Sequence, residues 1–247
     1  MPDYEVQYEL LRPADMVARR KAFPVAWLPI GTLEWHGPQN PLGLDATKAH
    51  GILVRCARKT GGVVFPPLFY GEVREQAMVD NDMAAEYEVP AENFQPGYMF
   101  YSLAEETTQY HQLLVHTFHQ ITSLGFRVII VCAGHYPLLD HARAAMSVFR
   151  QTARRRKHQP TTGWVFTGYE LVNDLFPKAG DHGGPWETSL MMSLDPQTVD
   201  SARLPDGTSA EYGERGLEAI AERVAARAKD MVENPGKYLG HWTPVER

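Results

Sequence analysis

Three side chains near the N-terminus could together hold a metal ion. Glu34 and His36 follow an apolar run at residues 25–30, and Asp45 comes nine residues after His36, across a loop rich in glycine and proline. Because side chains alternate along a strand, Glu34 and His36 project to the same side if the strand continues. Carboxylates and imidazoles are the ligands of hydrolytic divalent metal sites. The spacing therefore predicts a metal site, although a surface turn uses the same residue types.

Two later segments carry further candidate ligands beside glycine. His135 follows the apolar residues 128–132, and a third segment contains Asp181, His182 and Glu187. Glycine allows tight turns and a close approach of the backbone to a ligand. The agreement among the three segments strengthens the prediction of one metal site to which all of them contribute.

Apolar runs short enough for buried strands alternate with longer amphipathic patterns along the chain. We expect strands at residues 25–30, 63–65, 128–132 and 163–167. We expect helices at residues 12–20, 46–58, 102–123, 138–157, 171–176 and 216–232. This alternation predicts an α/β fold with a mainly parallel sheet and helices on both faces. Ligands bind beyond the carboxyl ends of such strands, which is where the three segments fall.

One stretch, residues 68–101, shows no clear periodicity. A loop this long inside a compact domain is usually functional or in contact with another subunit. Its aromatic residues argue against a disordered insertion. No linker or internal repeat divides the chain, so residues 1–247 are expected to form a single domain.

Composition narrows the class of partner. The formal net charge of -6 argues against a nucleic-acid or anionic-membrane partner. No apolar run approaches the ~18 residues that a membrane span needs, and the N-terminus lacks a signal pattern. Cys56 and Cys132 lie in apolar contexts without a metal-binding spacing, as buried free thiols do in a reducing compartment. We therefore expect a soluble, cytoplasmic protein.

Taken together, the three segments resemble the motifs of the creatininase (creatinine amidohydrolase) family. The family's opening motif, Gly-Ser-x-Glu-Gln-His-Gly-Pro-His-x-Pro followed by Asp, is similar to residues 31–41 and Asp45. Its second motif, Asn-Gly-His, resembles residues 133–135. Its third, Asp-x-His-Ala-Gly-x-x-Glu-Thr-Ser, resembles residues 180–189 with the His-to-Glu spacing kept. The motifs run in the family's order and span most of the chain.

The resemblance implies a three-layer α/β sandwich and a hydrolase with two divalent ions. Zinc and manganese are the usual ions, and sites of this kind also accept iron. By the same resemblance Glu34 and His135 would bind one metal, His36 would bind the other, and Asp45 would bridge them. His182 would act as the catalytic proton shuttle. A homo-oligomer, often a hexamer, is also implied.

Departures from the family pattern leave the fifth ligand open. Creatininase itself has a ligand Glu where this chain has Pro137. Glu187 is our candidate for this ligand, and as a ligand it would belong to the catalytic machinery. Asp140 is the weaker alternative. Ala133 stands in place of Asn and Trp35 in place of Gln, and these changes argue against creatinine as the substrate.

The leading hypothesis is an amidohydrolase that cleaves the C–N bond of a small substrate, cyclic amides included. A metal-bridging hydroxide would attack the carbonyl carbon, the metals would stabilise the oxyanion, and His182, oriented by Asp181, would protonate the leaving group. Four residues are candidates for substrate binding: Trp35, Gln39, Tyr136 and Trp186.

Two rival hypotheses remain. Gln39 and Asn40 could bind hydroxyl groups, which suits a ring-opening hydrolase of a cyclic polyhydroxy-ketone such as a dehydro-inosose. Pro137 instead suits a non-catalytic binding or assembly protein that has lost one metal.

Overall fold

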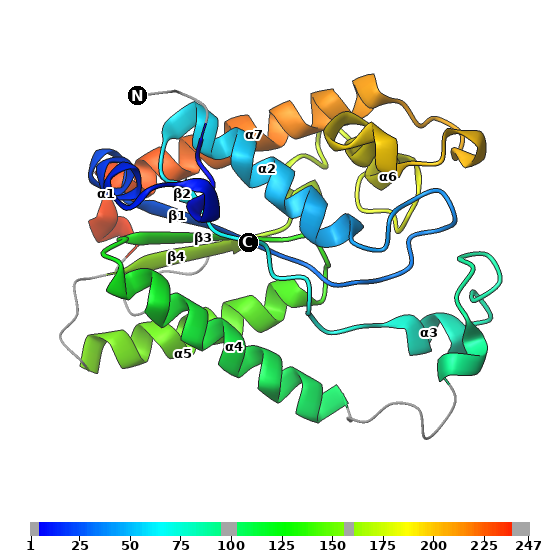
Figure 1. Cartoon of the computed structure of the whole chain (residues 1–247), viewed down its shortest axis with the longest axis horizontal. Coiled ribbons are helices and arrows are strands. Elements are labelled where there is room, and N and C mark those ends of the chain that lie inside the picture. Colours follow the sequence, from blue (N-terminus) through cyan, green and yellow to red (C-terminus); the bar gives the residue numbers. More distant parts are fainter. Residues whose placement is uncertain (1–4, 95–102, 156–160, 239–247) are drawn as a thin grey trace.

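A parallel sheet of four strands in the order β2-β1-β3-β4 forms the centre of the molecule (Figure 1). The computed structural model describes residues 5–94, 103–155 and 161–238. The strands are β1 (Val25–Ile30), β2 (Val63–Val64), β3 (Val128–Ala133) and β4 (Thr162–Phe166). The α-helices within these ranges are α1 (Pro13–Ala22), α2 (Leu44–Thr60), α3 (Glu75–Asp80), α4 (Leu103–Ser123), α5 (Leu138–Arg155), α6 (Pro185–Leu194) and α7 (Ala210–Glu233).

Helices cover both faces of the sheet, as predicted. Helices α2 and α7 lie on one face, and α4 and α5 lie on the other (Figure 1). Side chains of β1 alternate between the two cores: Trp27 packs with α2 and α7, whereas Leu28 packs with α4 and α5. A strand with both faces buried reads as a continuous apolar run, which is why β1 and β3 were visible in the sequence.

Three helical expectations need correction. Helix α6 was missed because Gly183, Gly184 and Pro185 suggest a loop, although proline at the first helical position is a common helix start. Helix α7 begins at Ala210 rather than at residue 216, since the Ser209 side chain accepts the Tyr212 N–H and caps it. Within residues 171–176, Leu171 ends a short 3₁₀ helix and residues 172–175 are turns, because the proline that follows disfavours α geometry.

The stretch from residue 68 is less irregular than expected. It contains α3 and a 3₁₀ turn at Ala91–Phe94. Residues 95–101 of that stretch, and residue 102 at the expected start of α4, lie outside the described residues.

Cys56 and Cys132 are buried free thiols, as expected. Of the helices in the described ranges, none is both long and apolar enough to cross a membrane.

Two glycines at the strand ends set the position of α2. A Cβ on Gly31 would lie 2.3 Å from the Ala46 backbone nitrogen, and one on Gly134 would lie 2.0 Å from the Asp45 carbonyl oxygen. Both glycines follow their strands directly, and the Gly134 N–H donates to the Ile30 carbonyl at 2.8 Å. The first turn of α2 therefore rests on bare backbone, which brings Asp45 to the carboxyl edge of the sheet.

Adding a methyl group at this contact should destabilise the fold. We expect Gly134→Ala to lower the free energy of unfolding by about 1–3 kcal/mol, as overpacking of a tight core does. Urea unfolding measures the change. Gly236→Ala is the control, because nothing lies within 4 Å of that position. Equal effects of the two substitutions would contradict this account of the close contact.

Candidate functional site

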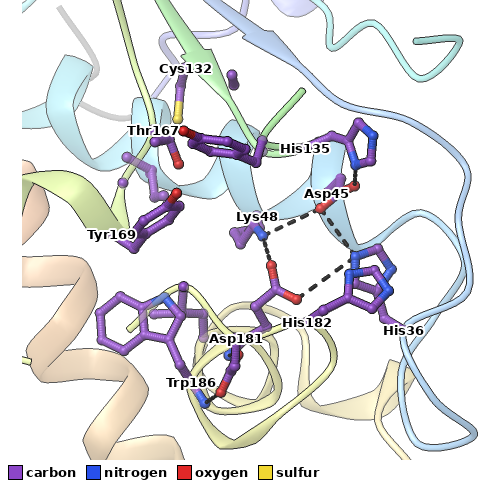
Figure 2. A pocket seen from close by; sticks show the side chains of 18 of the residues that line it. His36, Asp45, Lys48, Cys132, His135, Thr167, Tyr169, Asp181, His182 and Trp186 are labelled. Carbon is purple, nitrogen blue, oxygen red and sulfur yellow. Dashed lines mark hydrogen bonds and ion pairs between the residues drawn. The ribbon is translucent and has the colours of Figure 1, made fainter. Parts of the chain in front are cut away.

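The three predicted segments converge at the carboxyl edge of the sheet. Glu34 and His36 lie in the loop after β1, Asp45 in the first turn of α2, His135 just after β3, and Glu187 in α6. All five are buried, with exposed fractions between 1% and 7%. The structure brings together all five candidate metal ligands expected from the sequence, of which His36, Asp45 and His135 are labelled in Figure 2.

Glu34, Asp45 and His135 form what we call the first donor set. The His135 Nδ1 atom lies 2.9 Å from Glu34 Oε2 and 3.2 Å from Asp45 Oδ2. Both of these oxygens are buried and lack a well-directed hydrogen bond from any described residue. Ligand atoms bound at ~2.1 Å to a common ion lie about 3 Å apart, so these three atoms suit a cation between them.

His36, Asp45 and Glu187 form the second donor set. The His36 Nε2 atom lies 3.3 Å from Asp45 Oδ1 and 3.8 Å from Glu187 Oε2. The other ring nitrogen, Nδ1, lies 3.0 Å from the Glu34 carbonyl oxygen. Donation to that carbonyl leaves the Nε2 lone pair free for a metal, which is how outer hydrogen bonds fix a ligand tautomer. The two oxygens of Asp45 thus face different donor sets.

His182 lies beside the second donor set, with its ring centroid 4.3 Å from that of His36. Its Nε2 atom lies 2.9 Å from the Trp35 carbonyl oxygen, a geometry in which Nε2–H donates and Nδ1 is left free. Asp181 does not orient this imidazole through its carboxylate. That carboxylate instead accepts the backbone N–H groups of Trp186 and Glu187, at 2.8 and 3.2 Å, and so fixes the start of α6.

Gln39 and Asn40 hold two of the segments together. The Gln39 side-chain amide donates to the Gly183 carbonyl at 2.5 Å, and the Asn40 amide donates to Thr188 Oγ1 at 2.9 Å. These bonds tie the loop after β1 to the start of α6. The amides that suggested binding of a polyol are therefore used inside the protein.

A cavity of about 240 Å³ opens beside the two donor sets. Tyr136 and Trp186 line it, as the sequence suggested, although Trp186 is only 2% exposed and packs mainly against Phe176 and Tyr212. In the described part of the chain, Trp35 and Gln39 are not among its lining residues, so the structure does not place these two substrate candidates at the cavity. They act on the site indirectly, through the Trp35 carbonyl and the Gln39 amide.

Of the two candidates for the fifth ligand, Glu187 lies within the cluster of donor atoms and Asp140 does not. Glu187 belongs to the second donor set. The Asp140 side chain is 84% exposed and pairs with Arg143. Pro137 lines the cavity but contributes no donor group.

Lys48 belongs to the same buried cluster, and the sequence analysis missed it. It lies one turn after Leu44 and one turn before Ile52, on the buried stripe of α2, with 7% of its surface exposed. Its amine pairs with Glu187 and lies 3.3 Å from Asp45 Oδ1 (Figure 2). A charged residue on an apolar helical stripe was the signal that could have revealed it.

Glu75 on α3 was also missed, and no sequence pattern points to it. It is 2% exposed. Burial, helped by the nearby Glu34 carboxylate, raises the pKa of Glu75 to about 7.

The donor sets hold protons in the absence of metal. Burial alone would lower the pKa of His36, but the carboxylates of Asp45 and Glu187 outweigh it and raise this pKa to about 9. Asp45 and Glu34 in the same way raise the pKa of His135 to about 9. Against the cost of burial, His36 and Lys48 hold the pKa of Asp45 well below its usual range. A bound cation would replace the protons on the two imidazoles.

A parallel sheet with carboxylates and imidazoles collected beyond its carboxyl edge is typical of an α/β hydrolytic enzyme. The chain belongs to the creatininase family: the family model described as creatinine amidohydrolase matches residues 9–240. Members of this family are hydrolases, and the chain is an enzyme of that class. This excludes the hypothesis of a non-catalytic binding or assembly protein.

Two curated relatives show the range of the family. The chain is 25% identical to the creatinine amidohydrolase of Pseudomonas putida over 76% of its own length and 71% of that protein. It is 26% identical to the mycofactocin precursor peptide peptidase of Mycobacterium ulcerans (strain Agy99), over 90% of its own length and 87% of that protein.

Solved creatininase structures share the fold. One crystal structure of creatinine amidohydrolase superposes with a TM-score of 0.73 at 21% identity, covering 92% of this chain and 98% of that one. A creatininase structure described as a manganese form has a TM-score of 0.71 at 22% identity, and the match covers 92% of this chain and 99% of that one. A mutant creatininase structure described as a Zn–Zn form has a TM-score of 0.71 at 21% identity, and the match covers 92% of this chain and 98% of that one.

The stability of metal-free protein should fall as the pH rises from 6.5 to about 9. The pKa values of His36 and His135 rise on folding from 6.5 to about 9, so their stabilising contribution is complete below pH 6.5 and is lost as the pH passes 9. Thermal unfolding of chelator-treated protein measures this. His135→Gln should flatten the fall, whereas His116→Gln, at an exposed position of α4, should not. An unfolding temperature of the metal-free protein that stays constant from pH 6.5 to about 9 would contradict the raised pKa values of His36 and His135.

Proposed function

We propose that the protein is a divalent-metal-dependent amidohydrolase that cleaves a C–N amide bond of a small substrate. The observation that carries the proposal is the pair of buried donor sets that share Asp45. The two curated relatives, an amidohydrolase and a peptide peptidase, both have names that denote hydrolysis of an amide bond. These names support an amide as the substrate class.

Two divalent ions, one in each donor set, are the cofactors we propose. Glu34 and His135 would hold the first ion, His36 and Glu187 the second, and Asp45 would bind both through its two oxygens. The manganese and Zn–Zn titles of the related structures support zinc or manganese, and a site of imidazoles and carboxylates also accepts iron.

When bound, such ions supply a water-derived nucleophile at neutral pH and polarise the carbonyl of the substrate. The chain's own residues then position the reactants and move the proton. His182 lines the cavity, and its Nδ1 is the ring nitrogen left free to carry a proton to the leaving amine. Tyr87 donates to the His182 backbone carbonyl at 3.1 Å and so fixes this residue from the stretch after residue 68.

The cavity favours a small substrate with one polar and one apolar part. Its polar lining includes His36, Asp45, His135 and Glu187 of the donor sets, together with Lys48 and His182. Its apolar lining includes Ile52, Cys132, Leu190 and Ile220. Tyr136 and Tyr169 also line it, with ring centroids 6.0 Å apart. A homo-oligomer and a cytoplasmic location remain predictions from the sequence.

A substrate screen with defined metal content tests the proposal. Chelator-treated protein reloaded with Mn²⁺ or Zn²⁺ should hydrolyse members of a panel of cyclic amides and short peptides. It should leave cyclic polyhydroxy-ketones and lactones intact. Asp45→Ala should lose both ions and all activity, whereas Asp140→Ala should keep both. Turnover of ketones alone would favour the ring-opening alternative, and full activity without metal would refute the proposal.

His182→Gln tests the proton-transfer role separately. We expect kcat to fall by roughly 10²-fold or more, as loss of a general acid does, while the metal content stays that of the unsubstituted protein. A substrate with a good leaving group should be affected least, since it needs little protonation. An unchanged kcat for poor and good leaving groups alike would show that another group moves the proton.

A further inference from the structure

The Lys48 amine lies against carboxylate oxygens that belong to the second donor set, where a metal ion would otherwise be the cation. Its side chain is 9% exposed, and its two partners, Glu187 and Asp45, are both members of the second donor set. A buried ammonium is tolerated only when carboxylates pair with it. Lys48 therefore uses two of the three groups that a second metal ion would need.

The two donor sets differ in how far their oxygens are already satisfied. In the first set, Glu34 Oε2 and Asp45 Oδ2 face the His135 ring nitrogen at 2.9 and 3.2 Å but, within the described ranges, receive no well-directed hydrogen bond. In the second set, Lys48 lies against Asp45 Oδ1 and Glu187 Oε1, and the Gly183 N–H donates to Glu187 Oε2 at 2.8 Å. The unsatisfied oxygens all belong to the first set.

The charges of the cluster also favour one bound ion over two. Glu34, Asp45 and Glu187 contribute three negative charges, and Lys48 contributes one positive charge. With both imidazoles neutral, a single divalent ion therefore brings the net charge of these four groups to zero. A second ion adds two uncompensated positive charges in a site with little access to water, which is unfavourable. Without the ammonium, the cluster with one ion bound would keep a net charge of −1, which would partly compensate a second ion.

We propose that Lys48 makes the two metal positions unequal. The first donor set takes its ion tightly, and the Lys48 ammonium serves as the resident counter-charge of the second set. An ion enters the second set only when Lys48 gives up Glu187 and Asp45. This inference rests on the proposed function, because it takes both donor sets as metal sites, and it adds the order and the inequality of their filling.

Calorimetric titration of the chelator-treated full-length chain with Mn²⁺, checked by elemental analysis, tests the proposal. The unsubstituted protein should bind one tight equivalent and a second equivalent at least about tenfold more weakly, the size of effect that a neighbouring group has on metal affinity. Lys48→Met should tighten the second step by about tenfold or more and leave the first within about threefold. Lys59→Met, a change of an exposed lysine on the same helix that pairs with Glu218, should alter neither step.

The outcomes separate this inference from the proposed function. Two equally tight equivalents in the unsubstituted protein, or a second step that Lys48→Met does not change, would overturn the role of Lys48 while leaving a metal-dependent hydrolase in place. Binding of no metal at all would overturn both. Lys48→Gln removes the charge and keeps donor groups, so it gives the same comparison if Lys48→Met fails to fold.

Discussion

The carboxylate of Asp45 is 1% exposed and meets a different partner at each oxygen. Oδ2 lies 3.2 Å from His135, and Oδ1 lies 3.3 Å from both His36 and Lys48. A buried carboxylate is stable only where such partners compensate for lost hydration. The site exists because the first turn of α2 rests on Gly31 and Gly134, which carry no side chain to hold it away.

The remaining groups are held around this carboxylate by bonds that run between segments distant in the sequence. Gln39 and Asn40 join the loop after β1 to the start of α6, and Asp181 holds the backbone of that start. Tyr87 adds a contact from the stretch after β2. Hydrogen bonds from side-chain amides, the Asp181 carboxylate and the Tyr87 hydroxyl thus hold these segments in place. The imidazoles and carboxylates of the donor sets can therefore face one another.

The sequence predicted what depends on local patterns. Strands β1 and β3 were visible as apolar runs, and Glu34, His36 and Asp45 were visible as donors after a strand. Helix α6 was not, because its glycines and proline resemble a loop and its stability comes from Asp181 and from packing of Trp186. Lys48 escaped notice because its role depends on Glu187, which only the folded chain brings beside it. The place of Lys48 on the apolar stripe of α2 was visible in the sequence, but the identity of its partner was not.

In the mechanism proposed here, one carboxylate, Asp45, serves two metal positions of unequal strength. Anomalous diffraction from crystals soaked at increasing Mn²⁺ concentration tests this most directly. A peak among Glu34, Asp45 and His135 should appear first. A second peak, among His36, Asp45 and Glu187, should follow only at higher concentration, with Lys48 moved away from Glu187. Simultaneous filling, first filling of the second position, or an ion that does not touch Asp45 would contradict the account.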